Sequence, residues 1–133
     1  MTVPPSPGAS DVPIDGNPLL IAAAKASVPA SRLPDLLATV QTHLRPQASQ
    51  YRRSFERIHR DDDRELFFVP TDHWEELGDT LGFDRRERDA VQRAHEEQLK
   101  RIGSACDRRG EFETALELRS VVVIGTEKGD RSV

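Results

Sequence analysis

Residues 73–103 read HWEELGDTLGFDRRERDAVQRAHEEQLKRIG and predict two helices joined by a short turn at Gly82. Apolar residues recur at helical spacing on both sides of that glycine. On the first helix they are Trp74, Leu77 and Leu81. On the second, which we expect to reach about residue 108, they are Val91, Ala94, Leu99, Ile102 and Ala105. Both apolar faces are therefore expected in the core of a helical domain.

Acidic residues mark where these two helices begin. Asp72 with Glu75, and Asp84 with Glu87, have the spacing of a capping box, in which side chains satisfy the free N–H groups of the first turn. Upstream, we expect helices over residues 18–27 and 31–44. After Pro46, a further helix is expected with an apolar face and a basic one. The apolar face comprises Ala48, Tyr51, Phe55 and Ile58, and the basic face comprises Arg52, Arg53, Arg57 and Arg60.

Two short segments are typical of β-strands. Residues 65–69 (ELFFV) are rich in aromatic residues and stop at Pro70, and residues 120–124 (SVVVI) are a β-branched run. Since unpaired backbone groups are costly, these two strands are expected to pair with each other. The predicted fold is mainly α: a compact helical domain of five to six helices with a small two-stranded sheet.

The length of 133 residues suits one domain. Residues 1–17 contain Pro4, Pro5, Pro7 and Pro13 and are expected to be a flexible tail. We place a single helical domain at residues 18–125 and a loose C-terminal tail at 126–133. No apolar run approaches the length of a membrane span, so we expect a cytoplasmic protein that does not contact a membrane.

Catalytic and metal-binding motifs are not found in the sequence. His95-Glu96 begins like a zinc-protease helix, but the position one turn later is Leu99 rather than a second histidine. The four histidines are dispersed, and Cys106, the single cysteine, is expected on the inward side of its helix as a small apolar residue. We therefore expect no enzyme, no catalytic residue, no metal and no cofactor.

The leading functional hypothesis is a non-enzymatic protein-interaction or regulatory module. It rests on Val121, Val122, Val123 and Ile124, which would offer a hydrophobic strand edge. Such edges are either covered or used for pairing. The partner would be an unidentified protein or a second copy of the chain.

The alternative is a helix-turn-helix DNA-binding regulator formed by residues 71–93. Arg85, Arg86 and Arg88 stand at the helix end that would approach a DNA groove. Neighbouring acids dilute this charge, and the whole chain has a formal net charge of −4, which makes nucleic acid the less favoured partner. Arg52 and Arg53 are a second candidate contact for nucleic acid or another anion, although Glu56 is placed to pair with Arg52 along a helix.

Residues 73–103 together with 111–125 (EFETALELRSVVVIG) resemble small uncharacterised helical-domain proteins of halophilic archaea. The resemblance covers roughly residues 18–125 and brings no catalytic residues with it. It implies a cytoplasm with molar salt, which agrees with the presence of 16 Arg and only 3 Lys. A GC-rich genome produces the same bias towards arginine.

Overall fold

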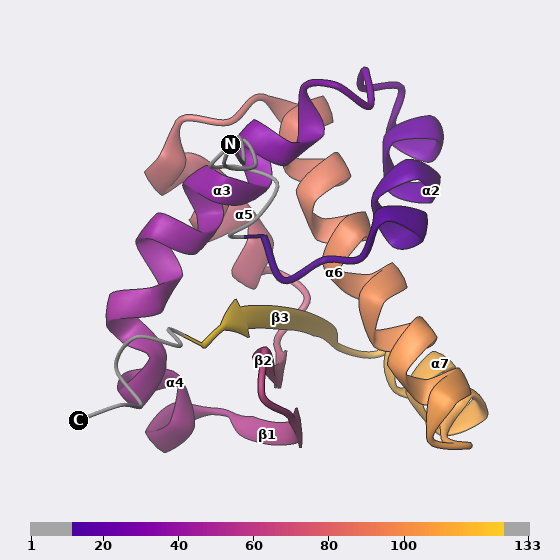
Figure 1. Ribbon diagram of the computed structural model, residues 1–133. Helices are drawn as coiled ribbons and strands as arrows, with labels where there is room; N and C mark the ends of the chain where they lie inside the picture. Colours follow the sequence, from indigo (N-terminus) through magenta and orange to yellow (C-terminus); the bar gives the residue numbers. More distant parts are fainter. Residues whose placement is uncertain (1–11, 127–133) are drawn as a thin grey trace, which may run out of the picture.

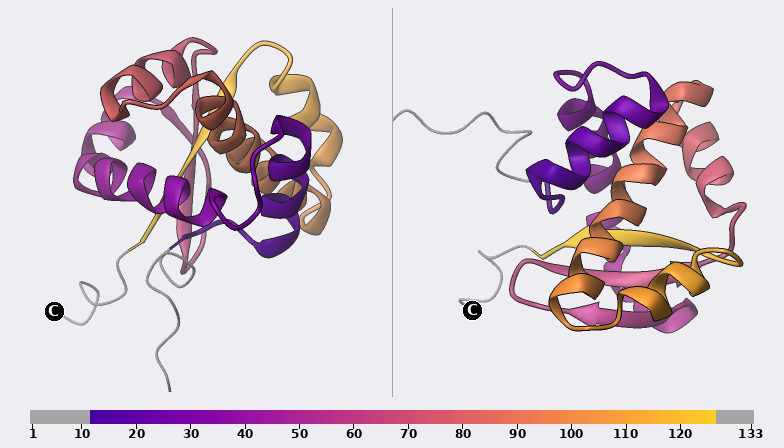
Figure 2. Two further views of the ribbon diagram at one scale, coloured as in Figure 1. Left: turned by 90° about the horizontal axis from the view of Figure 1, so that it is seen from above. Right: turned by 90° about the vertical axis from the view of Figure 1, so that its right-hand side faces the viewer.

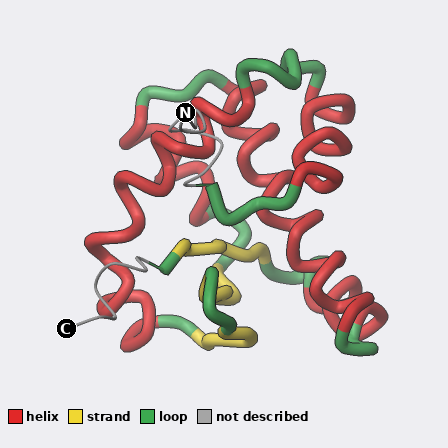
Figure 3. Tube along the Cα trace, viewed as in Figure 1, coloured by secondary structure: helices red, strands yellow, loops and turns green. Residues whose placement is uncertain are grey.

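Helices form most of the chain, as predicted, in a computed structural model that describes residues 12–126 (Figure 1). The elements in chain order are α2 (Gly16–Ala26), α3 (Leu33–Leu44), the 3-10 turn η1 (Arg45–Gln47), α4 (Ala48–Ser54), β1 (Glu56–Arg60), β2 (Arg64–Val69), α5 (His73–Leu81), α6 (Arg85–Ala105), α7 (Arg109–Ala115) and β3 (Ser120–Gly125). In Figure 1 the sheet lies in the lower part of the molecule, α2, α3 and α5 lie above it, and α6 runs down towards it. Figure 3 shows how short the strands are beside the helices.

The sheet is antiparallel and has the strand order β1-β2-β3. Phe67 on β2 lies opposite Val122 on β3, which confirms the predicted pairing of these two segments. The expected two-stranded sheet is nevertheless wrong, because β1 pairs with the other side of β2. The mainly helical class with a small antiparallel sheet therefore holds, with three strands instead of two.

The extra strand replaces the second half of a predicted helix. α4 ends at Ser54, and Phe55 already has extended backbone angles, with φ −132° and ψ 160°. Arg57 and Arg60, which we expected on a helix face, consequently lie on β1. The cause is a tertiary contact, because β2 supplies backbone hydrogen-bond partners for residues 56–60. The helical spacing of the side chains in this segment gives no indication of that pairing.

The aspartates after β1 form the turn of the β1–β2 hairpin. The Asp61 carboxylate accepts hydrogen bonds from the backbone N–H groups of Asp63 at 2.8 Å and Arg64 at 3.0 Å. At the same end of the sheet, the backbone N–H of Thr126, the residue after β3, donates to the Asp63 carbonyl at 2.9 Å. The Asp61 side chain therefore stabilises the hairpin turn, and the Thr126–Asp63 bond holds this turn against the end of β3.

α6 is the central helix, and its start is the predicted one. The Asp84 carboxylate accepts from the Glu87 N–H at 2.8 Å, and the Glu87 carboxylate accepts from the Asp84 N–H at 2.9 Å, which confirms this capping box. The same prediction for α5 is wrong, because Asp72 makes no side-chain bond to the helix. Figure 2 shows α6 with α2 and α7 alongside it. No helix within residues 12–126 combines the length and apolar character needed to cross a membrane.

Two further expectations need correction. The first concerns residues 12–17, which were assigned to the flexible tail. Ile14 is only 6% exposed, and the backbone N–H of Asp15 donates to the Gln98 side chain on α6 at 2.6 Å, so this part of the segment packs on the domain. Residues 1–11 and 127–133 of the predicted tails lie outside the described residues. The second concerns Cys106, which follows the last residue of α6 and is exposed instead of facing inward.

Candidate functional site

The predicted partner-binding strand is buried. Val121, Val122, Val123 and Ile124 are at most 1% exposed. β3 is at the end of the strand order, so its outer backbone groups have no neighbouring strand. Gln41 on α3 takes that place: its side-chain amide donates to the Val123 carbonyl at 2.7 Å and accepts from the Gly125 N–H at 2.8 Å. A single glutamine thus satisfies two backbone groups of the edge.

Two aromatic side chains complete the cover of this edge. The backbone N–H of Val123 donates to Nδ1 of His95 at 2.9 Å, and the Trp74 indole N–H donates to the Val121 carbonyl at 3.0 Å. Since Nδ1 of His95 accepts a hydrogen bond, its proton sits on Nε2. The imidazole is fully buried, and this burial lowers the pKa of His95 to about 3. The expectation that Val121–Ile124 offer an open edge is wrong, because helix side chains occupy it.

The arginines of α4 also differ from expectation. Arg52 donates to Glu65 on β2, with Nε 2.9 Å from Oε2, and Arg57 on β1 donates to the same carboxylate at 3.0 Å. The hydrogen bonds from Arg52, more than its charge, hold the pKa of this buried carboxyl below its usual range. Arg52 is therefore a structural residue. Arg53 is exposed and has no ion-pair partner within residues 12–126.

Glu56, expected to pair with Arg52 along a helix, instead lies on β1 and pairs with Arg119 at 3.1 Å. Its place on a strand separates it from the α4 arginines, so the predicted helical charge ladder is wrong. The four arginines that we expected on one helix face are thus divided between two elements: Arg52 and Arg53 lie on α4, and Arg57 and Arg60 lie on β1.

The arginines of α6 behave differently, because they do come together. Arg85, Arg86, Arg88 and Arg93 line one shallow hollow of about 430 Å³, with Asp89 and with Ala26 from the end of α2. We call these four residues the arginine surface. The sequence drew attention to the first three. Arg93 was missed, although its position two turns after Arg86 on the same exposed helix face is a signal that could have identified it.

Local packing positions this surface. Gly82 ends α5 in the left-handed region with φ 73°, which turns the chain into α6. The stem of Arg88 lies across Gly78 of α5, where an added Cβ would be only 3.0 Å from Arg88 Cγ and Cδ. A glycine at this position thus lets the aliphatic part of Arg88 pack tightly on α5 while its guanidinium reaches the hollow.

The charge of the arginine surface is only partly neutralised. Arg93 pairs with Asp89 at 2.8 Å, and Glu87 pairs with Arg32. Arg85, Arg86 and Arg88 have no ion-pair partner in the part of the chain that the structure describes. Three guanidinium groups are therefore available at one end of α6.

The pair α5–α6 has the order of a helix-turn-helix unit, but its second helix is enclosed. From Ala90 to Gly103, α6 buries a broad set of residues against the rest of the domain, among them His95 and Gln98. Its exposed residues lie at its two ends: Arg85 and Arg86 at the start, and Arg101, Ser104 and Ala105 in the last turns. A DNA-recognition helix needs its N-terminal residues free to enter the major groove. Here these residues are free, while the following turns are held in the core.

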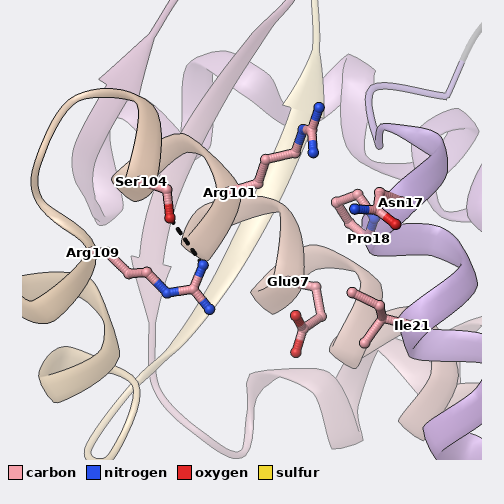
Figure 4. Close-up of a pocket in the computed structure, with 7 residues that line it drawn as sticks. All are labelled: Asn17, Pro18, Ile21, Glu97, Arg101, Ser104 and Arg109. Carbon is pink, nitrogen blue, oxygen red and sulfur yellow. Dashed lines mark hydrogen bonds between the residues drawn. The ribbon is translucent and has the colours of Figure 1, made fainter.

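A second hollow, of about 180 Å³, lies at the other end of α6 and is lined by Asn17, Pro18, Ile21, Glu97, Arg101, Ser104 and Arg109 (Figure 4). Its charged groups already have partners. Arg101 pairs with Asp15 at 3.1 Å, and Arg109 donates to Ser104 at 2.9 Å. This second hollow is therefore neutralised from within the chain.

Metal binding finds no support in this part of the chain. Residues 12–126 contain no group of three or more His, Cys, Asp or Glu side chains arranged to hold an ion. Of the two hollows, the one at the arginine surface has charged groups without an ion-pair partner among the described residues.

No curated protein and no solved structure is significantly similar to the chain. One protein family matches residues 12–126, which are also the residues that the structure describes. The match covers every helix and strand from α2 to β3, and with them the arginine surface. The chain belongs to the family described as Domain of unknown function (DUF8048).

Proposed function

We propose that the chain is a non-enzymatic, cytoplasmic interaction domain that binds an acidic protein surface through Arg85, Arg86, Arg88 and Arg93. One observation carries the proposal: three of these guanidinium groups share a hollow and have no ion-pair partner within residues 12–126. Elsewhere, arginines such as Arg52 and Arg101 are engaged by carboxylates of the same chain. The domain uses no cofactor for this binding.

Arginine chemistry suits a carboxylate ligand. A guanidinium group donates two parallel hydrogen bonds to one carboxylate, so recognition combines charge with geometry. Salt screens charges that are far apart more strongly than it screens an arginine and a carboxylate in direct contact. This difference matters in the salt-rich cytoplasm that the resemblance to proteins of halophilic archaea implies. The hollow of about 430 Å³ has room for more than one acidic side chain.

Protein fits this surface better than nucleic acid. Asp84 directly precedes the arginines, and Glu87 and Asp89 stand among them along the chain, so these carboxylates would oppose a continuous phosphate backbone. An acidic protein surface can place its carboxylates at separate points and avoid them. The formal net charge of −4 also disfavours a polyanion that covers a large area.

A direct binding comparison tests the proposal. Fluorescence anisotropy is measured with a labelled acidic peptide and with a labelled DNA duplex, for the wild-type chain and for the Arg85→Gln/Arg86→Gln variant. We expect the wild type to bind the peptide more tightly than DNA, and the variant to lose about tenfold or more in affinity, because each charged hydrogen bond contributes about 1.5 kcal/mol or more.

The matched control is Arg53→Gln/Arg60→Gln, which removes the same charge from two exposed arginines elsewhere. This control should bind like the wild type. Equal losses in both variants would mean that only net charge matters, and the proposal would fail. Tighter binding to DNA, lost in the Arg85→Gln/Arg86→Gln variant, would instead support the helix-turn-helix alternative.

A further inference from the structure

We infer that the acidic partner is a second copy of this chain, which docks the outer face of its α5 against the arginine surface. This inference rests on the proposed function and adds the identity of the partner. It also replaces the strand edge as the means of self-association, since β3 is covered by Gln41, His95 and Trp74.

The outer face of α5 carries a row of carboxylates, which we call the acidic stripe. Its members recur at helical spacing and are all exposed: Asp72, Glu75, Glu76 and Asp79. The opposite face of α5 buries Trp74 and Leu77 in the core. The stripe therefore points away from the body of its own domain.

Cations within residues 12–126 do not neutralise the acidic stripe. Within residues 12–126, its one charged-group contact is from Nδ1 of His73 to Glu76, at 3.8 Å. Burial lowers the pKa of His73, so this imidazole is neutral at pH 7 and supplies no positive charge. The acidic stripe and the arginine surface are thus both left with unbalanced charge of opposite sign.

The two features lie at the same end of the molecule. α5 leads into α6 through the short turn at Gly82, and the Arg88 stem rests on Gly78 of α5. Both views of Figure 2 show α5 beside the start of α6. Even so, the described residues contain no ion pair between α5 and α6, because each presents its charges outward.

Two-fold symmetry uses this arrangement directly. When two copies meet around a two-fold axis, the acidic stripe of each can face the arginine surface of the other, so the same pair of contacts forms twice. Each surface has four charged side chains, and the residual positive charge lies mainly on Arg85, Arg86 and Arg88. A closed two-fold dimer requires a self-complementary surface, and these two oppositely charged patches on neighbouring helices supply one.

The test uses two charge-reversed variants of the full chain. Arg85→Glu/Arg86→Glu reverses part of the arginine surface, and Glu75→Lys/Asp79→Lys reverses part of the acidic stripe. Sedimentation equilibrium gives the dimer dissociation constant of each protein and of an equal mixture of the two. Circular dichroism melting curves verify that each variant is folded.

The wild type is expected to dimerise, and each variant alone to dimerise at least about tenfold more weakly, because like charges then face each other. The mixture should recover a heterodimer, since each reversed surface again meets the opposite charge. Arg53→Glu/Arg60→Glu, the matched control, should dimerise like the wild type.

A wild-type chain that stays monomeric up to a concentration of about 1 mM would overturn the inference. Two variants that do not recover association when mixed would also overturn it. The acidic-peptide measurement separates this failure from that of the proposed function: a monomer that binds the peptide through Arg85 and Arg86 keeps the function and loses only the dimer. A monomer that does not bind the peptide loses both.

Discussion

The outer edge of β3 and the arginine surface of α6 are opposites in how their polar groups are satisfied. On β3, side chains from three helices bond to backbone groups of Val121, Val123 and Gly125. On α6, Arg85 and Arg86 are exposed and have no ion-pair partner in the described part of the chain. Groups satisfied inside the molecule contribute to folding stability, whereas groups left with unbalanced charge are available for binding.

The largest loss of folding stability is expected when the hydrogen bonds to the outer edge of β3 are removed. Replacing Gln41→Leu keeps the approximate volume but leaves the Val123 carbonyl and the Gly125 N–H buried without their partner. Each unsatisfied group costs about 1–3 kcal/mol, so for the two groups we expect a loss of roughly 2–6 kcal/mol in the free energy of unfolding, measured by urea denaturation. The control Gln50→Leu, at an exposed position of α4, should change it by less than about 0.5 kcal/mol. Equal effects would contradict the sealing role of Gln41.

Acid should weaken the same edge through His95. Its pKa is about 3 in the folded chain and about 6.5 when unfolded, so below pH 6.5 the unfolded chain binds a proton that the folded chain does not. Stability present at pH 8 is therefore lost as pH falls, by about 2 kcal/mol at pH 5 from this group alone.

Urea denaturation between pH 8 and pH 5 measures this loss for the wild type and for His95→Gln. Glutamine can still accept the hydrogen bond from Val123 but does not titrate. The variant should therefore show a shallower dependence of stability on pH. His73 contributes in the same direction, because burial also lowers its pKa, so the slope should shrink without vanishing. An unchanged slope would contradict the assignment to His95.

The smallest effect on folding should come from the arginine surface. Arg85→Gln/Arg86→Gln is expected to change the free energy of unfolding by less than about 0.5 kcal/mol, because neither side chain has an ion pair with another residue of 12–126. Arg52→Gln offers the contrast: it removes charged hydrogen bonds to the buried Glu65 and should cost about 1 kcal/mol or more. Thermal melting distinguishes the two. A marked destabilisation by the first variant would place Arg85 and Arg86 in the fold instead of on a binding surface.

Of the two capping boxes predicted from sequence spacing, one is formed and the other is not. Asp84 and Glu87 are three residues apart and form the expected capping box. The same spacing in Asp72 and Glu75 failed, since Asp72 has a helical backbone conformation, with φ −82° and ψ −3°, instead of the extended one that a capping residue adopts. A spacing thus indicates a cap, and the backbone at the helix start determines whether the bond is made.

The candidate site was identified only in part from the sequence. Arg85, Arg86 and Arg88 stood out because they are consecutive or nearly so at a helix start. Arg93 joins them through the hollow beside Ala26, a residue 67 positions away along the chain. Val121–Ile124 were correctly placed on a strand that pairs with residues 64–69, but the helices that cover its free edge begin far away in the sequence. Coverage of an edge is a long-range property that a local pattern does not report.

The order of residues alone was enough to indicate a mainly helical chain, the α5–α6 pair with its turn at Gly82, and the pairing of β2 with β3. These features follow from side-chain periodicity, capping and the conformational freedom of glycine, all of which act over a few residues. The strand β1, the cover over β3, and the division of arginines into paired and unpaired depended on which distant groups meet after folding. Buried backbone groups and buried carboxylates need a hydrogen-bond partner, and the folded structure supplies that partner from any part of the chain. The sequence alone does not indicate which distant residues come within hydrogen-bond distance of each other.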